Sequence, residues 1–284
     1  MIGDHDELVP LLDRIMTDYR DRRDFFGGRT LPANAVLEET AFADRPKALY
    51  LTFTCVTDHI HNVIGRTKQK AGEDGLWWVC ARLLQNDPWL FDPAELVGND
   101  RRSDLETRFK RIDLMDGRDP DWWYRTATIL DREFDSDPRN LLQQYDYDAV
   151  RLEAAITGRY DFPGLWGRKN CPRWLRLMND EIHGLENLEA IDVPVDFHIV
   201  NVVAQLVEAE IDPRDEEDEE VARQLWREVC DRQGYAPVQL ELPVRLLNRD
   251  WHAGGQEYVD AITDSGPEST VAADAASNVR SSPN

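Results

Sequence analysis

The sequence predicts an all-α fold. Apolar side chains recur at steps of three and four residues through most of the chain, which is the spacing of one face of a helix. No hairpin series and no alternation of strands with helices is evident, so neither a sandwich nor a parallel sheet is expected. The chain has 284 residues, of which 42% are hydrophobic and nine are tryptophan, so it can bury a substantial core.

The first predicted helix has an apolar stripe, made of Leu8, Leu11, Leu12, Ile15, Met16 and Tyr19. Gly27, Gly28 and Pro32 mark the turn that follows it. Residues 46–64 are apolar over most of their length and fit a helix buried among others. Their threonine and valine content leaves a strand as the alternative.

A further helix begins at Asp119, which is expected to be its N-cap, with Pro120 at the first helical position. The acidic stretch 212–220 is expected to be a solvated loop and the start of a helix, where carboxylates are favourable. The remaining expected helices cover 73–84, 103–113, 146–157, 169–186, 197–208, 221–233 and 240–252.

Three regions are expected along the chain. Residues 1–45 would form an N-terminal helical segment that packs on the core, and residues 46–262 would form the main domain. Residues 263–284 are rich in serine, alanine and aspartate without an apolar period, so they are expected to be a disordered tail.

The charge of the chain is strongly negative. Its net charge is −22, and only five of its 33 basic residues are lysine. An acidic, lysine-poor composition is typical of proteins from salt-accumulating halophiles, and taken alone it favours a protein with no nucleic-acid role. In molar salt, however, the Debye length falls to about 3 Å, so only local contacts decide whether DNA binds.

No part of the sequence indicates a membrane protein or a secreted one. It has no apolar run of transmembrane length and no signal-type N-terminus. The cysteines Cys55, Cys80, Cys171 and Cys230 are scattered and form no CxxC pair. We therefore expect a cytoplasmic monomer without a disulfide framework or a structural zinc site.

The segment FPGLWGRK, residues 162–169, has the features of an anion-binding turn. Gly164 and Gly167 would permit positive φ and close approach of another molecule. The turn leads into a helix start, where unpaired N–H groups favour an anion such as a DNA phosphate, and Arg168 and Lys169 add positive charge. A plain interhelical turn with exposed basic residues is the alternative.

Asp196 follows one helix length later, within VPVDFH at residues 193–198. A buried or half-buried carboxylate could stabilise positive charge on a deoxyribose as its base leaves. Lys169 could then act as an amine nucleophile on C1′. The alternative for Asp196 is an N-cap of the next helix.

These two segments, in this order, resemble the helix-hairpin-helix DNA glycosylases, a superfamily that includes endonuclease III and the 8-oxoguanine glycosylases. The form of VPVDFH is most similar to the 8-oxoguanine branch. The resemblance covers residues 45–255 approximately. It implies a fold of two helical lobes with the active site in the cleft between them.

The resemblance also implies an activity, which is base-excision repair of double-stranded DNA with the damaged base flipped out. Asp196 would be the catalytic aspartate and Lys169 the Schiff-base nucleophile of an apurinic or apyrimidinic site lyase, and an oxidised purine such as 8-oxoguanine is the favoured base. No cofactor is expected, because the cysteine cluster of an iron–sulfur centre is absent from the sequence. A monovalent cation at the hairpin is compatible with the family. The implied DNA-binding residues are Gly164, Leu165, Trp166, Gly167, Arg168 and His198.

Several assignments stay open on sequence alone. The hairpin has one residue more than the family usually has, so a monofunctional enzyme that uses water is the alternative to Lys169 chemistry. Trp166 would stack on a base, or wedge into the minor groove, or pack against a neighbouring helix. Cys171 would line the base pocket or act as a small buried hydrophobe, and His198 would bond near Asp196 or be structural.

By the resemblance, a residue from Asp58 to Asn62, toward the end of the helix expected over 46–64, would fill the gap left by the flipped base, and Asp58 is a candidate for the base pocket. The histidines at 59 and 61 do not share a helix face, so no metal site is expected. Two rival classes are a non-catalytic helix-hairpin-helix protein and an acidic helical protein with no nucleic-acid role. Only the DNA binders would show a surface patch made of Arg168, Lys169, Arg173 and Arg176.

Overall fold

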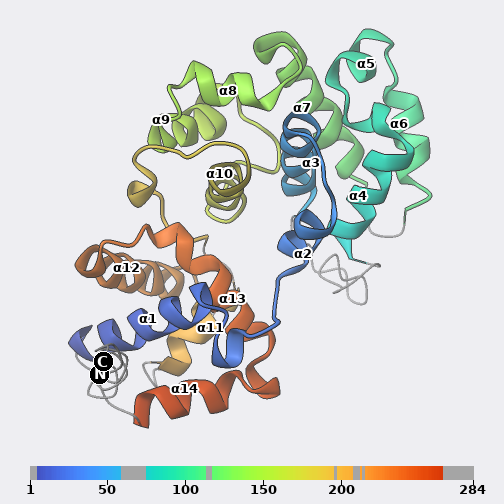
Figure 1. Cartoon of the computed structure of the whole chain (residues 1–284). Coiled ribbons are helices and arrows are strands. Elements are labelled where there is room, and N and C mark those ends of the chain that lie inside the picture. The colour runs from blue at the N-terminus through green and yellow to red at the C-terminus, as the bar shows by residue number, and fades with distance from the viewer. Residues whose placement is uncertain are drawn as a thin grey trace, which may run out of the picture. The chain divides into compact units, whose positions relative to one another are not determined.

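The computed structural model describes residues 5–58, 75–112, 117–194, 197–206, 212 and 215–264. Over these residues the chain is mostly helical and contains no strand, apart from an isolated bridge between Asp148 and Glu186 (Figure 1). The all-α prediction is therefore confirmed at the level of fold class. The expected tail from residue 265 onward lies outside the described residues.

The chain divides into two compact units. The terminal unit comprises Met1–Arg29, Phe197–Gln233 and Leu242–Asn284, and the central unit comprises Thr30–Asp196 and Gly234–Glu241. The first division along the chain thus falls before the expected boundary at residue 45, with residues 30–45 in the central unit.

The central unit is built around one buried helix, α3 (Asp44–Thr57). Every side chain from Ala48 to Thr57 is buried, which confirms the helix and removes the strand alternative for these residues. The other α-helices of this unit are α2 (Pro32–Glu39), α4 (Leu76–Asn86), α5 (Pro93–Gly98), α6 (Arg102–Phe109), α7 (Asp119–Phe134), α8 (Pro138–Gln144), α9 (Ala149–Ala154) and α10 (Asn170–Glu181).

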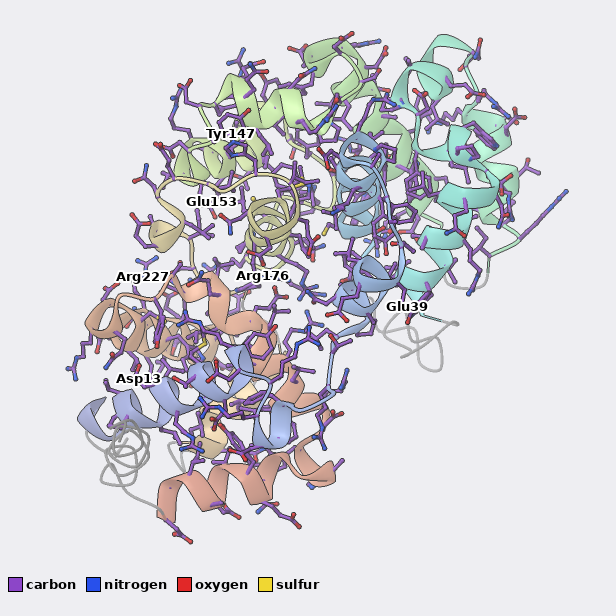
Figure 2. The ribbon with its side chains drawn as sticks, in the orientation of Figure 1. Asp13, Glu39, Tyr147, Glu153, Arg176 and Arg227 are labelled. Carbon is purple, nitrogen blue, oxygen red and sulfur yellow. The ribbon has the colours of Figure 1, made fainter. Side chains whose placement is uncertain are left out.

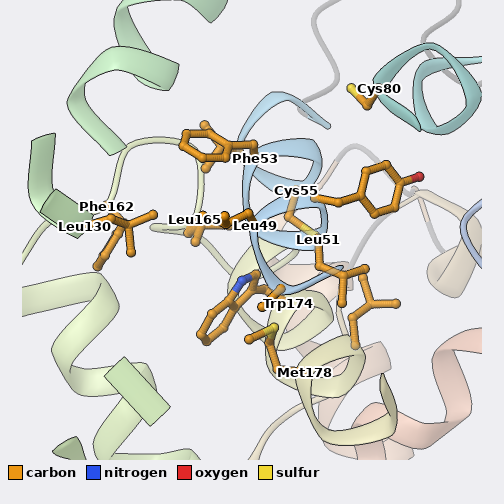
Figure 3. Packing of buried hydrophobic residues seen from close by; sticks show 14 of the residues in the cluster. Leu49, Leu51, Phe53, Cys55, Cys80, Leu130, Phe162, Leu165, Trp174 and Met178 are labelled. Carbon is orange, nitrogen blue, oxygen red and sulfur yellow. The ribbon is translucent and has the colours of Figure 1, made fainter. Parts of the chain in front are cut away.

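Aromatic side chains on three helices hold α3 in place. Phe53 stacks on Trp123 of α7 with ring centroids 4.6 Å apart. On another side, the indole nitrogen of Trp174 in α10 donates to the hydroxyl of Thr52 at 3.0 Å, which satisfies both buried polar groups. Figure 3 shows Phe53 and Trp174 among the buried residues around α3. Burying a side chain as large as phenylalanine stabilises a fold by about 1.5–3 kcal/mol.

Two predicted boundaries differ from the structure. Helix α7 starts one residue early, with Arg118 as its N-cap, so the expectation that Asp119 is the N-cap is wrong. Asp119 is instead fully buried in the first turn, where a carboxylate faces the positive end of the helix. Helix α10 has Pro172 in its first turn, as expected, but it ends at Glu181 rather than at residue 186.

The terminal unit is also helical. It contains α1 (His5–Arg20), α11 (Phe197–Leu206), α12 (Glu216–Gln233), all of α13 (Glu241–Arg249) except Glu241, and α14 (Gly255–Asp264). Helix α12 starts inside the acidic stretch, with carboxylates in its first turn as expected. Helix α14 was not expected; its Tyr258 hydroxyl donates to the buried carboxylate of Asp18 in α1 at 3.0 Å.

Some charged side chains of these units are exposed and others are buried. Glu39 and Arg227, which Figure 2 labels, are exposed, whereas the labelled Arg176 of α10 is almost completely buried. None of the described helices combines the length and the apolar character needed to span a membrane.

Candidate functional site

The predicted short helix, glycine turn and second helix are all present in the central unit. Helix α9 continues into a single wide turn, Ala155–Arg159, and α10 follows at Asn170. Phe162 and Leu165 are each 1% exposed, so they fasten the intervening turn to the core. The side chain of Leu165 is therefore a core side chain, so its expected contact with DNA stays a prediction for its backbone alone.

Gly164 is the glycine that the turn requires. Its φ is +76°, and a Cβ atom at this position would lie 2.2 Å from the carbonyl oxygen of Val56, near the end of α3. No side chain fits there without moving backbone. Gly167 has neither a left-handed φ nor a neighbouring atom within 4 Å of a Cβ. The close approach at Gly164 is thus to the protein's own α3.

Asn170 joins the turn to α3 as well. Its side-chain amide donates to the carbonyl oxygen of Gly164 at 2.9 Å and to that of Cys55 at 3.2 Å. Both acceptors are backbone groups, so this asparagine fixes the start of α10 against the end of α3. These hydrogen bonds also fix the backbone of Lys169, which directly precedes Asn170.

Lys169 and Asp58, two of the residues singled out from the sequence, come together at this point. The Lys169 amine donates to the backbone oxygen of Asp58 at 3.1 Å and lies 4.0 Å from Oδ1 of the same residue. The side chains are 17% and 9% exposed, respectively. The structure thus holds a nearly buried amine beside a carboxylate at the start of α10.

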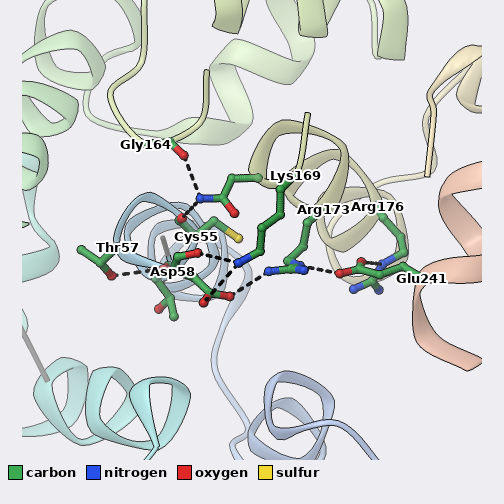
Figure 4. A network of polar contacts seen from close by, with 10 residues as sticks. Cys55, Thr57, Asp58, Gly164, Lys169, Arg173, Arg176 and Glu241 are labelled. Carbon is green, nitrogen blue, oxygen red and sulfur yellow. Dashed lines mark hydrogen bonds and ion pairs between the residues drawn. The ribbon is translucent and has the colours of Figure 1, made fainter. Parts of the chain in front are cut away.

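Asp58 belongs to a longer row of buried charges, shown in Figure 4. Its Oδ2 accepts from Nη1 of Arg173 at 2.9 Å. Nε of Arg173 donates to Oε1 of Glu241, and Nε of Arg176 donates to Oε2 of Glu241 at 2.8 Å. Arg176 also donates to Asp180 at 3.2 Å. Positive and negative groups therefore alternate from Lys169 to Asp180.

The charges of this row determine the ionisation of Glu241. Burial alone raises the pKa of this carboxyl group, but the charges of Arg173 and Arg176 and their hydrogen bonds outweigh burial, so the pKa lies below its ordinary value. Glu241 is therefore a carboxylate, and it neutralises two guanidinium groups in the interior.

The basic surface patch that would distinguish the DNA binders is not formed by the four residues expected in it, and this observation counts against both DNA-binding classes. Arg173 and Arg176 are 3% and 2% exposed, so neither belongs to a DNA-facing surface. Of the four residues expected in that patch, Arg168 is exposed and Lys169 is half-buried. Glu241, the partner of both arginines, lies 65 residues or more away in sequence and is marked by no motif.

Trp166 lies at the surface of the turn, with 51% of its area exposed. Cys171, by contrast, is completely buried in the hydrophobic core, and this burial raises the pKa of its thiol. That environment favours the small buried hydrophobe over the base-pocket residue.

Asp196 and the histidines at 59 and 61 lie outside the described residues, as does the side chain of His198. The distance between the Lys169 amine and the Asp196 carboxylate therefore stays a matter of prediction. Among the described side chains, histidine, cysteine, aspartate and glutamate form no group of three that could bind a metal ion.

Three functional groups lie at this turn: an amine, a neighbouring carboxylate and an exposed indole. The amine could attack an electrophilic carbon and the carboxylate could accept its proton. Comparison of the chain with known proteins finds no matching family model, no matching curated protein and no matching solved structure.

Proposed function

We propose that this protein is a DNA base-excision glycosylase of the helix-hairpin-helix kind, with Lys169 as the nucleophile. The observation that carries the proposal is the Lys169 amine, which is anchored at the start of α10 beside Asp58, at the end of a glycine turn. The two-lobed fold with its cleft belongs to the same proposal.

The proposed chemistry uses residues of known and predicted position. After the damaged base is flipped out, the amine nitrogen of Lys169 bonds to C1′ as the glycosidic bond breaks, and the base leaves with the bonding electrons and takes up a proton. Asp196 stabilises the positive charge on the sugar in the transition state. The ring oxygen takes up one of the two amine protons as its bond to C1′ breaks, which opens the sugar and gives an iminium. Loss of a C2′ proton to water then expels the 3′ phosphate with its bonding electrons.

The amine must be unprotonated before it attacks. The carboxylate beside it is Asp58, whose Oδ1 lies 4.0 Å from the amine nitrogen, so a small movement would bring the two atoms within reach of a proton transfer. Asp58 is held in turn by Arg173 at 2.9 Å, which keeps the carboxylate in place during the reaction.

One contact favours a second candidate function. The Lys169 amine already donates to the Asp58 backbone oxygen at 3.1 Å, which is also how a structural tether would be used. In that case the protein would be a non-catalytic helix-hairpin-helix DNA-binding protein, and Lys169 would only fasten α10 to α3.

Incubation with duplexes that carry 8-oxoguanine, uracil, thymine glycol or an alkylated purine, in molar KCl, separates the two functions. The wild-type protein should release at least one base, and Asp196→Asn should abolish release. Borohydride reduction should cross-link the wild-type protein to the DNA, and Lys169→Gln should lose the adduct.

Lys47→Gln is the matched control for the cross-link. Lys47 is also half-buried and also lies beside a carboxylate, with its amine 3.4 Å from Glu181. The Lys47→Gln variant should form the same amount of DNA adduct as the wild-type protein. Base release without any adduct would refute Lys169 as the nucleophile, and binding of all duplexes without base release would establish the non-catalytic function.

A further inference from the structure

Two tryptophans meet on the central unit where the first turn of α7 lies against the glycine turn. The ring centroids of Trp122 and Trp166 are 6.2 Å apart, with the planes inclined at 67°. Trp122 also packs directly on the turn, because its Cε3 lies 3.1 Å from the Cβ position of Gly164. Trp122 thereby fixes the turn from which Trp166 projects.

Trp166 is exposed, unlike the tryptophans of the hydrophobic core. Trp123 and Trp174 are completely buried, whereas Trp166 has the highest exposure of any large hydrophobic side chain in the part of the chain that the structure describes. A single exposed apolar side chain is ordinary on a protein surface. This one is supported by a second indole and has about half of its area exposed.

One arginine lies against this pair of rings, and two others lie on the segments that carry the rings. The guanidinium carbon of Arg118 lies 5.4 Å from the Trp122 ring centroid, within the range of a cation–π interaction. Arg168, two residues after Trp166, is exposed, and Arg125 of α7 is half exposed in a loose pair with Asp161, at 3.7 Å. Arg118 and Arg168, on the two segments that carry the rings, are therefore exposed positive groups in a chain of net charge −22.

A nucleotide has the complementary chemistry, because its base has a flat aromatic face and its phosphate is negative. Only an unpaired base exposes that face, since a paired base is stacked within its helix. We propose that Trp166, supported by Trp122, is a stacking site for one unpaired nucleobase of DNA, and that Arg118 and Arg168 contact the adjoining phosphates.

This site rests on the proposed function only because it takes DNA as the ligand. It narrows the substrate to DNA that has an unpaired base next to the turn that carries Trp166. It also explains how an acidic chain can hold a polyanion. Stacking does not depend on charge, so it persists in molar salt, where the Debye length of about 3 Å screens all but direct ionic contacts.

The test uses the full chain and two fluorescein-labelled DNAs of the same sequence, one fully paired and one with a central unpaired bubble. Trp166→Ala should weaken binding to the bubble about 30-fold, the middle of the range for base–aromatic stacking, and should change binding to the paired duplex less than about 2-fold. Trp166→Phe, which keeps an aromatic face, should recover most of the loss.

Two controls identify the cause of the change. Trp89 lies under the guanidinium group of Arg101 at 3.7 Å, so Trp89→Ala removes a comparable aromatic–arginine pair on a different segment and should leave both affinities unchanged. Raising KCl from low to molar concentration should leave the Trp166→Ala effect intact and should reduce the effect of Arg168→Ala.

The outcomes separate this inference from the glycosylase proposal. Equal affinities of wild type and Trp166→Ala for the bubble, with base release and the Lys169 adduct intact, overturn the stacking site alone. Loss of bubble binding with no base release by the wild type supports the stacking site and overturns the glycosylase. Failure to bind either DNA overturns both.

Discussion

Replacing Glu241 by glutamine tests the buried row of charges most directly. The Glu241 side chain is 1% exposed and accepts hydrogen bonds from Arg173 and Arg176, the second at 2.8 Å. Glutamine has nearly the same volume and shape, so the substitution removes the charge without opening a cavity. Two guanidinium groups then share one neutral oxygen in the interior.

The loss of stability in Glu241→Gln depends on which ion pairs Arg173 and Arg176 retain. Removing one partner of a buried ion pair destabilises a protein by about 3–5 kcal/mol, because a charge remains buried without compensation. Here Arg173 retains Asp58 at 2.9 Å and Arg176 retains Asp180 at 3.2 Å. We therefore expect Glu241→Gln to lower the free energy of unfolding by about 3 kcal/mol, the lower end of this range. For a unit of this size, that corresponds to a fall in Tm of about 6–12 °C.

Glu181→Gln is the matched control. Glu181 also lies in the central unit, at the end of α10, and pairs with Lys47 at 3.4 Å, but its side chain is 25% exposed and that of Lys47 is 20% exposed. Pairs in contact with water are worth about 0–1 kcal/mol. Urea unfolding in molar KCl, followed by tryptophan fluorescence, measures both variants under the same conditions.

The stabilisation by Glu241 also has a defined pH dependence. The pKa of Glu241 in the folded protein lies below its ordinary value of 4.5, because Arg173 and Arg176 outweigh the effect of burial. The contribution is therefore fully present above the pKa of the unfolded chain and is lost as pH falls through the folded value. The difference between wild type and Glu241→Gln should stay constant from neutral pH down to about pH 5 and diminish below it. Equal stabilities of the Glu241 and Glu181 variants, or a difference that grows on acidification, would refute the reasoning.

Two further substitutions test the packing of each unit. Gly164→Ala should destabilise the central unit by about 2–4 kcal/mol, through the left-handed φ and the contact with α3, whereas Gly167→Ala should change stability by less than about 0.5 kcal/mol in the same urea titration. Tyr258→Phe should cost about 1–3 kcal/mol, because it removes a hydrogen bond from the buried carboxylate of Asp18; a thermal melt no different from that of wild type would show that this bond does not hold α14 to α1.

Helix starts show where the sequence was informative and where its signals were misread. An aspartate followed by proline predicts an N-cap at Asp119, but the helix there starts one residue earlier. The same pair does cap α5 and α8. Asp92 accepts from the N–H of Ala94 at 3.1 Å, and Asp137 accepts from that of Arg139 at 3.0 Å. Both short helices could therefore have been predicted from their caps, although their apolar period is too brief to detect.

The candidate site was predictable only in part. The glycine turn and the lysine at the next helix start were found because they are adjacent in sequence and their chemistry is local. The buried partners of α10 were not found, because its apolar period places Trp174 and Met178 inside but gives no reason to bury Arg173 as well. A buried arginine needs a carboxylate, and Glu241 comes from a segment far along the chain. Only the tertiary structure supplies that pairing.

The burial of these arginines changes how the charge of the chain bears on DNA binding. Arginines that neutralise carboxylates in the interior cannot release counterions from a phosphate backbone, and Lys169 itself lies beside Asp58. Of the expected patch, Arg168 alone is exposed, so with Arg118 only two cations would contact phosphates, and the dependence of affinity on salt should be shallow. Affinity for DNA would then depend on contacts that salt does not screen, namely the backbone of the turn and the indole of Trp166. A protein that binds in this way keeps its DNA at salt concentrations that dissociate a basic protein, and this is the condition to which an acidic, lysine-poor composition is suited.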